Sequence, residues 1–168
     1  MYSGRFGDTS GRPYVEALVI LPRLKIEAGI SFAVDTGADQ TVLMPADAIT
    51  AGISYAKLAR PTTVIGLGGP CKCFIEKAFI ILPDINRLFT YVIDIRIADR
   101  NAPAGLSCPS ILGLDVINRL RMIYNAPKNE VVFTMVSADL IVPLGKRAAK
   151  RIKKWLQSEI KKLNHLHD

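Results

Sequence analysis

A short apolar segment that runs into a carboxylate is the part of this sequence best suited to chemistry. Residues 32–39 have the sequence Phe-Ala-Val-Asp-Thr-Gly-Ala-Asp, in which Asp35 follows the apolar residues and Gly37 comes two positions later. Glycine tolerates a sharp turn, so we expect the acid to stand at a bend directly after a buried strand. A carboxylate held in this way can act as a general acid or a general base. Taken alone, however, Asp-Thr-Gly more often marks an ordinary turn.

Two further segments favour a catalytic interpretation. Residues 64–70, Val-Ile-Gly-Leu-Gly-Gly-Pro, place a glycine-rich centre between two predicted strands, which is typical of the tip of a mobile hairpin. Residues 110–115, Ser-Ile-Leu-Gly-Leu-Asp, place two apolar residues and a glycine before a helix that is expected to start near Asp115. Together, the three segments are far more specific than any one of them.

In this order, the three segments resemble the retropepsin family, the retroviral-type aspartic proteases and their cellular relatives. The resemblance covers residues 14–136. It implies an all-β fold, a single retropepsin-like acid-protease β-barrel domain with one short helix after Ile-Leu-Gly. It also implies an aspartic endopeptidase, a peptide hydrolase that needs no cofactor.

The resemblance also implies roles for individual residues. Asp35 matches the catalytic aspartate, Thr36 the threonine whose hydroxyl crosses to the partner subunit's backbone, and Gly37 the glycine that lets backbone approach the carboxylates. Residues 65–69 match the flap that closes over a bound peptide. Retroviral members carry an arginine where this chain has Leu114, so the subunit contact made by that arginine is not expected here. The residues expected to bind substrate are Ala38, Asp39, Ile65, Gly66, Leu67, Gly68, Gly69, Pro109 and Ile111.

The chemistry of this family requires a second carboxylate. Two carboxylates share one proton: one activates a water, while the other polarises the scissile carbonyl. Large two-lobed aspartic proteases carry two triplets in one chain, whereas this chain of 168 residues has one convincing triplet. A symmetric homodimer is therefore expected to complete the site and to cut polypeptides with apolar side chains at the cleavage point. The rival hypothesis is a retropepsin-like dimer that binds peptides or mediates assembly without cutting.

Other acids and glycines have simpler explanations. Asp8 also begins a triplet-like sequence, but residues 5–7 before it do not form a buried strand. Asp115 is expected to cap the helix that starts near it rather than to act as a second acid. The glycines at 66–69 lack the Lys-Ser/Thr of a phosphate-binding P-loop.

The histidines and cysteines also argue against other enzyme classes. Both histidines lie near the C-terminus, at 165 and 167, so a Ser/His or Cys/His hydrolase is not expected. No metal site is expected, because zinc needs four closely spaced nitrogen or sulfur ligands. The three cysteines are too few for a disulfide framework and are expected to be ordinary thiols: Cys71, Cys73 and Cys108.

Short strands separated by Pro and Gly must position these residues. Runs of apolar and β-branched residues predict strands at 14–21, 30–34, 62–65, 74–82, 89–97 and 131–135. Short helices are predicted at 45–51 and 116–120. Several short strands at this spacing favour an all-β sandwich or barrel-like domain.

Composition divides the chain into a flexible N-terminal segment (1–13), the protease domain (14–142) and a basic amphipathic C-terminal helix (143–168). The last part holds eight of the 22 Lys and Arg residues and two of the 15 acidic residues, so it carries +6 of the net charge of +7. Its apolar residues recur at helical spacing, with Trp155 beside them.

The apolar stripe of the C-terminal helix is expected to pack on the protease body or at the dimer interface. The alternative is that the helix recruits an anionic partner or a membrane surface. Nucleic acid is disfavoured, because Trp155 is the only aromatic residue near the charges.

The whole chain, 49% hydrophobic and 22% charged, has the composition of a folded domain. No apolar run is long enough to span a bilayer, and no apolar segment of a signal peptide is evident near the N-terminus. A cytoplasmic protein is therefore expected.

Overall fold

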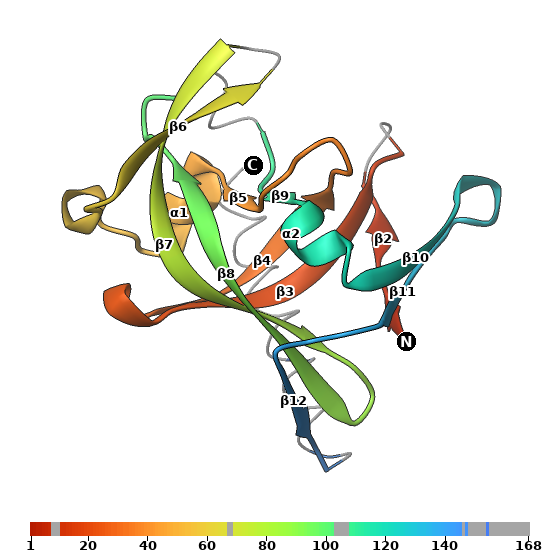
Figure 1. Cartoon of the computed structure of the whole chain (residues 1–168). Coiled ribbons are helices and arrows are strands. Elements are labelled where there is room, and N and C mark those ends of the chain that lie inside the picture. Colours follow the sequence, from red (N-terminus) through yellow and green to blue (C-terminus); the bar gives the residue numbers. More distant parts are fainter. Residues whose placement is uncertain (8–10, 67–68, 103–107, 146, 148–153, 155–168) are drawn as a thin grey trace.

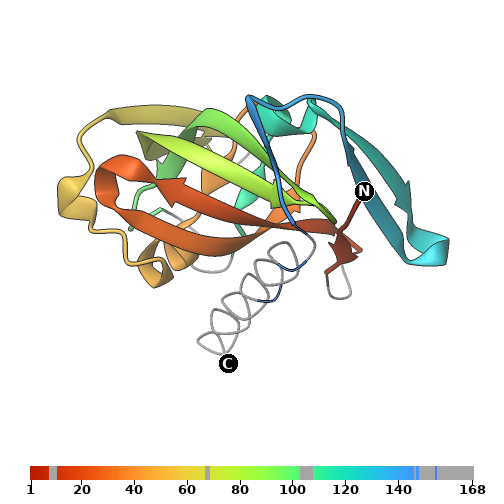
Figure 2. The ribbon, with the colours of Figure 1, turned by 90° about the horizontal axis from the view of Figure 1, so that it is seen from below.

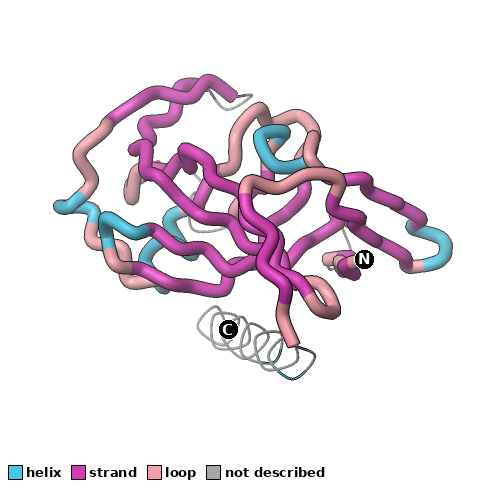
Figure 3. Tube along the Cα trace, turned by 60° about the horizontal axis from the view of Figure 1, so that its bottom comes forward, coloured by secondary structure: helices cyan, strands magenta, loops and turns pink. Residues whose placement is uncertain are grey.

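The computed structural model describes residues 1–7, 11–66, 69–102, 108–145, 147 and 154. Strands dominate the described chain, and the helices between them are short (Figure 3). The strands are β1 (Tyr2–Ser3), β2 (Arg5–Phe6), β3 (Pro13–Leu21), β4 (Ile26–Val34), β5 (Val42–Leu43), β6 (Pro61–Gly66), β7 (Gly69–Pro83), β8 (Arg87–Ala98), β9 (Ile111–Leu112), β10 (Leu120–Asn125), β11 (Glu130–Met135) and β12 (Leu140–Pro143). The helices are α1 (Pro45–Thr50), α2 (Leu114–Ile117) and the 3₁₀ turns η1 (Pro22–Leu24), η2 (Tyr55–Lys57) and η3 (Ala126–Lys128).

The larger sheet closes into a barrel. Its strand order is β12-β8-β5-β9-β4-β3-β7-β6. β7 also pairs with β8, so the strands from β8 to β7 in this order form a closed ring (Figure 1). The β7–β8 register runs from Cys73 opposite Ala98 to Pro83 opposite Leu88, so the closure is extensive. Closing a sheet on itself removes exposed edges. The all-β, barrel-like fold predicted from the sequence is thus confirmed.

Side chains of β3 alternate between the core and the other face of the sheet. In β3, every second residue from Val15 to Leu21 is buried, and the residues between them are partly exposed. This period of two is what a strand needs to present one face to a core. The core contains fully buried side chains from β4, β7 and β8, among them Phe32, Ile80 and Tyr91.

The N-terminal segment corrects one expectation. Instead of a flexible lead-in, it contains β1, which pairs with β11, and β2, which pairs with β3. Tyr2 is only 5% exposed, and its hydroxyl donates a hydrogen bond to the carbonyl of Glu16 at 2.9 Å. Strands of two residues are too short to produce a periodic pattern, so only tertiary pairing reveals them.

The hairpin after α2 also differs from expectation. The predicted helix at 116–120 ends at Ile117, and β10 begins at Leu120. The chain reverses through η3, where Asn129 adopts a left-handed conformation (φ 50°), and β11 then pairs along the whole of β10. β1, β11 and β10 form a separate three-stranded sheet, whose β10–β11 hairpin projects away from the barrel (Figure 2).

The described chain reaches its C-terminal end soon after β12. This strand pairs with β8 through Leu140 opposite Thr90 and Pro143 opposite Arg87. Apart from Arg147 and Lys154, the basic helix predicted at 143–168 lies outside the described residues from position 146 onward. No helix in the part of the chain that is described has the length and apolarity to cross a membrane.

We predict that Tyr2→Ala destabilises the fold by about 3 kcal/mol, because it empties a buried aromatic site. Urea unfolding measures the change. Ile85→Ala is the matched control: Ile85 is 74% exposed, so its truncation should change stability by less than about 0.5 kcal/mol. Equal stability of the two variants would mean that β1 does not help to hold the domain together.

Candidate active site

The candidate site is built around the turn that follows β4. Asp35 is the first residue after the strand, and its side chain is exposed. Its Oδ1 accepts a hydrogen bond from the backbone N–H of Gly37 at 2.8 Å, and its backbone carbonyl accepts one from Ala38 at 3.3 Å. A side chain at position 37 would bring a Cβ to 3.2 Å from Oδ1, so glycine suits this close approach. The turn thus holds the carboxylate while leaving it accessible to solvent.

The neighbouring strand β9 fixes the end of β4. The two strands are parallel, with Ala33 beside Ile111 and Val34 beside Leu112. The backbone N–H of Ala33 donates to the carbonyl of Ser110 at 2.8 Å, and that of Asp35 donates to the carbonyl of Leu112 at 3.1 Å. A segment far away in the sequence therefore holds the end of the strand from which Asp35 emerges.

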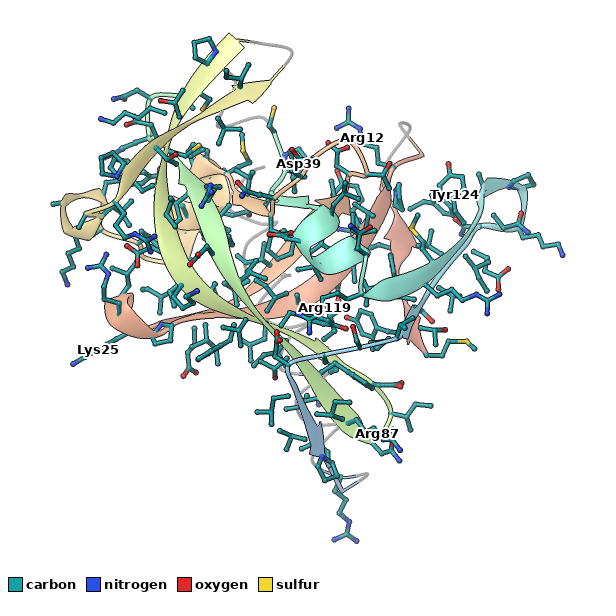
Figure 4. All side chains as sticks on the ribbon, in the orientation of Figure 1. Arg12, Lys25, Asp39, Arg87, Arg119 and Tyr124 are labelled. Atoms are coloured by element: carbon teal, nitrogen blue, oxygen red, sulfur yellow. The ribbon has the colours of Figure 1, made fainter. Side chains whose placement is uncertain are left out.

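The rest of the loop is bonded to the start of α2. The N–H of Leu114 donates to the carbonyl of Ala38 at 2.8 Å, and the N–H of Asp115 donates to the carbonyl of Asp39 at 3.2 Å. Figure 4 shows Asp39 beside β9 and α2. A Cβ at Gly113 would come within 2.3 Å of the backbone of Gln40, which leaves no room for any side chain there.

Thr41 and Asp115 complete this contact. The carboxylate of Asp115 accepts hydrogen bonds from the backbone N–H of Thr41 at 3.0 Å and from its hydroxyl at 2.6 Å. The Thr41 hydroxyl also accepts a hydrogen bond from the N–H of Gly113 at 3.2 Å. The expectation that Asp115 caps its own helix is therefore wrong: Gly113 is the capping position, and the acid bonds across to the loop. Because its oxygens are already engaged, Asp115 is poorly suited to act as a second catalytic acid.

A second polar cluster, formed by Ser110, Asp47 and the backbone of Met44, holds the residue that precedes β9. The hydroxyl of Ser110 donates to the carboxylate of Asp47 in α1 and accepts a hydrogen bond from the N–H of Met44 at 3.0 Å. Ser110 and Thr41 are both fully buried. Sequence reasoning missed Thr41, Ser110 and Asp47, since isolated polar residues give no periodic signal. The available hint was that Ser110 begins one motif and Thr41 follows another by two positions.

The predicted flap is a hairpin of β6 and β7. Their register runs from Pro61 opposite Phe74 to Gly66 opposite Gly69. Ile65, near the tip, is 84% exposed, and Gly69 has a φ of 93°, which favours glycine. The hairpin end and the β4–β5 loop lie at the same end of the molecule in Figures 1 and 3.

The predicted site residues fall into three groups. Those from Asp35 to Asp39 share the turn and loop after β4, with Ile111 beside them on β9 and half-buried. Pro109 is also half-buried and precedes β9. Ile65, Gly66 and Gly69 lie on the separate hairpin, and Leu67 and Gly68 lie outside the described residues. The roles predicted for all of them remain predictions.

Thiol and metal chemistry find no support among the residues that the structure describes. Burial, with the neighbouring Cys71 as a further cause, raises the pKa of the Cys73 thiol to about 12, so that this thiol is uncharged at neutral pH and is not a reactive nucleophile. In the described part of the chain, no group of three or more His, Cys, Asp or Glu residues is placed to hold a metal ion.

Solved structures with a similar chain fold include two proteases. One is a retropepsin-like aspartic protease from Rickettsia conorii, with a TM-score of 0.48 and 20% sequence identity over 78% of this chain and 96% of that chain. This chain resembles retropepsin-like proteases in its fold. The other is EIAV protease in complex with the inhibitor HBY-793, with a TM-score of 0.44 and 21% identity over 67% of this chain and 90% of that chain.

Sequence comparison adds no further relatives. No family model matches the chain, and no curated protein matches it. At these identities and TM-scores, nothing about activity follows from the two solved structures.

We predict that Thr41→Val destabilises the protein by about 2 kcal/mol, because it removes the hydroxyl that links Asp115 to Gly113 within a buried site. Thr41→Ser keeps the hydroxyl and should retain most of the stability. Urea unfolding of the two variants checks this. Indistinguishable midpoints for Val and Ser would show that the hydroxyl does not hold the loop.

Proposed function

We propose that two copies of this chain form an aspartic endopeptidase, in which Asp35 of each chain supplies one of the two catalytic carboxylates. The observation that carries this proposal is the geometry of Asp35: an exposed carboxylate at a strand end, held by the N–H of Gly37 and by a loop fixed to β9 and α2. Exposure lets the carboxylate reach a substrate, and the fixed backbone keeps it in one orientation.

In the proposed mechanism, the two Asp35 carboxylates face each other and share one proton. The charged one takes a proton from a water, and the protonated one donates a hydrogen bond to the scissile carbonyl as the water attacks. Two negative charges this close would repel each other, so one proton is kept between the two carboxylates. Thr36 and Gly37 would position the pair, with Thr36 bonding across to the partner subunit.

A homodimer is proposed because one chain offers a single acid of this kind. Asp115 is engaged by Thr41, and the sequence before Asp8 is not an apolar run like the one before Asp35. The three-stranded sheet supplies a surface for pairing: within the described residues, β10 pairs only with β11, and Ile123 and Tyr124 on it are 45% and 49% exposed. Exposed apolar side chains on an unpaired edge favour association with another strand.

The proposed substrate is an extended polypeptide with apolar side chains at the cleavage point. Ile111 and Pro109 would line its subsites, and Ala38 and Asp39 would contact its main chain. The β6–β7 hairpin would close over the peptide through residues 65–69. We further propose that the protein acts in the cytoplasm and that its basic C-terminal segment packs on the body or binds an anionic partner or membrane surface.

Leu114 bears on the proposed dimer. It stands where retroviral proteases carry an arginine, and here it is half-buried and packs against the core. Its backbone N–H, rather than a charged side chain, holds the catalytic loop through Ala38. The subunits would therefore associate without that arginine's contact, so the dimer is expected to be weaker than one that has it.

We predict that Asp35→Asn lowers kcat by roughly a thousandfold, since the amide cannot take part in the proton exchange. Cleavage of a mixed peptide library, with and without a statine-type inhibitor, measures the activity. Solution mass should be that of two chains for wild type and variant alike. Adding excess Asp35→Asn protein to wild type should reduce activity beyond simple dilution, because mixed dimers carry one competent acid.

Each alternative has its own outcome in this experiment. Cleavage that survives Asp35→Asn would refute the assignment of the acid. A strictly monomeric but active wild type would refute the shared site. A stable dimer that binds peptides, with neither form cutting them, would instead support a non-catalytic peptide-binding or assembly module.

We predict that Ala38→Ser moves the acid limb of the pH–rate profile to lower pH. A serine hydroxyl beside the catalytic turn can donate a hydrogen bond that favours the charged carboxylate, so more acid is needed to protonate it. With alanine at this position, activity is expected to be highest between mildly acidic and near-neutral pH. Profiles of kcat/KM for the two proteins provide the test, and superimposable acid limbs would contradict the prediction.

A further inference from the structure

Arg96 lies in the part of β8 that pairs with β5, the short strand after the Asp35 loop. It is opposite Val42 of β5 and opposite Ile75 of β7, and its backbone N–H donates to the carbonyl of Thr41 at 3.0 Å. Its sequence neighbours Ile95 and Ile97 are fully buried in the core. Because side chains alternate along a strand, Arg96 points to the other face of the sheet, away from the core.

That face carries the predicted catalytic and subsite residues. Val42, the partner of Arg96, also pairs with Ile111 of β9, and Ile111 pairs with Ala33 of β4. Directly paired residues present their side chains on the same face. Ala33 is two residues before Asp35, so the register connects Arg96 to the side of the sheet on which the candidate acid emerges.

The same face continues onto the predicted flap. Ala98, two residues after Arg96, is opposite Cys73 of β7, and Cys73 is opposite Thr62 of β6. Arg96 therefore stands between the base of the flap hairpin and the β5–β9 wall. In the proposed endopeptidase, a peptide that extends beyond the scissile bond would pass this position.

Two of the three guanidinium nitrogens of Arg96 have no hydrogen-bond partner among the described residues. Its Nε and Nη1 atoms are buried and unpaired. Two nearby acids pair with lysines instead: Asp94 on β8 is 2.9 Å from Lys77, and Asp99, just after β8, is 3.7 Å from Lys72. Lys77 is the main cause of the lowered pKa of Asp94, and the charge of Arg96 contributes less to it. A buried charged donor without an acceptor is unfavourable, so such a group is a strong candidate for binding an external acceptor.

We propose that Arg96 binds an acidic side chain of the peptide substrate and thereby selects Asp or Glu at one position flanking the scissile bond. The planar guanidinium can bind a carboxylate through two parallel hydrogen bonds. Apolar residues at the cleavage point and an acidic residue beside them would then define the recognised sequence. The inference rests on the proposed endopeptidase function, and its test is arranged to separate the two.

The test compares peptides that differ only by Glu or Gln. Starting from a peptide that the wild type cuts, each flanking position in turn is made Glu or Gln, and kcat/KM is measured at physiological salt. Wild type should prefer Glu at one position by roughly tenfold, as expected for a buried hydrogen-bonded charge. Arg96→Gln should abolish this preference, and Arg96→Glu should replace it with a preference for Lys at the same position.

Arg87→Gln is the matched control. Arg87 is an exposed arginine at the opposite end of the same strand (Figure 4), and its replacement changes the net charge equally. This variant should keep the wild-type preference, which excludes a general attraction of acidic peptides to a basic protein. Arg96→Met should melt at or above the wild-type temperature, because it removes unpaired buried donors. A large fall in melting temperature would instead assign Arg96 a structural role.

The outcomes distinguish this inference from the proposed function. If wild type cuts peptides but treats Glu and Gln alike at every position, the selectivity of Arg96 is refuted and the endopeptidase stands. If wild type cuts nothing, the inference is decided by fluorescence anisotropy with labelled peptides that carry a fixed central Glu or Gln. Tighter binding of the Glu peptides that Arg96→Gln removes would support it, and equal binding would overturn it.

Discussion

The contact between the loop after Asp35 and the start of α2 is the constraint on which the candidate site depends. Backbone N–H groups at the start of the helix bond to loop carbonyls, and Thr41 bonds to the carboxylate of Asp115. Gly113 lies so close to Gln40 that a single added carbon would force the two backbones apart. A helix of one turn thus serves as a clamp: its unpaired N–H groups need acceptors, and the loop supplies them.

The closed barrel gives this clamp a rigid support. Because β7 and β8 pair along most of their length, the strands that carry the hairpin and Arg96 are held to the strands that carry Asp35. The relative position of β7 and β8 is held by many backbone hydrogen bonds along their antiparallel pairing, and not by any single side chain. The β6–β7 pairing, from Pro61 opposite Phe74 to Gly66 opposite Gly69, extends beyond the part of β7 that pairs with β8.

Some features were predictable from local patterns, and others were not. Strands β3, β7 and β8 were predicted because each contains a run of apolar and β-branched residues. β5 and β9 have two residues each, and both exist only because partners from distant segments pair with them. The turn around Asp35 was predicted from its glycine and apolar flank, whereas the anchoring Ser110 and Thr41 were not, because a buried hydroxyl has no local signature.

By itself, the sequence determined the chemistry-bearing turn, the all-β character of the domain and the order of the three motifs along the chain. These depend on local properties, such as the flexibility of glycine and the preference of apolar and β-branched residues for strands. Only the tertiary structure decided that Asp115 bonds to Thr41 rather than to its own helix, that the N-terminal residues form strands, and that Arg96 lies with unpaired donors on the face of Asp35. Each of these depends on which distant segments become neighbours, and that is settled by packing around a shared core.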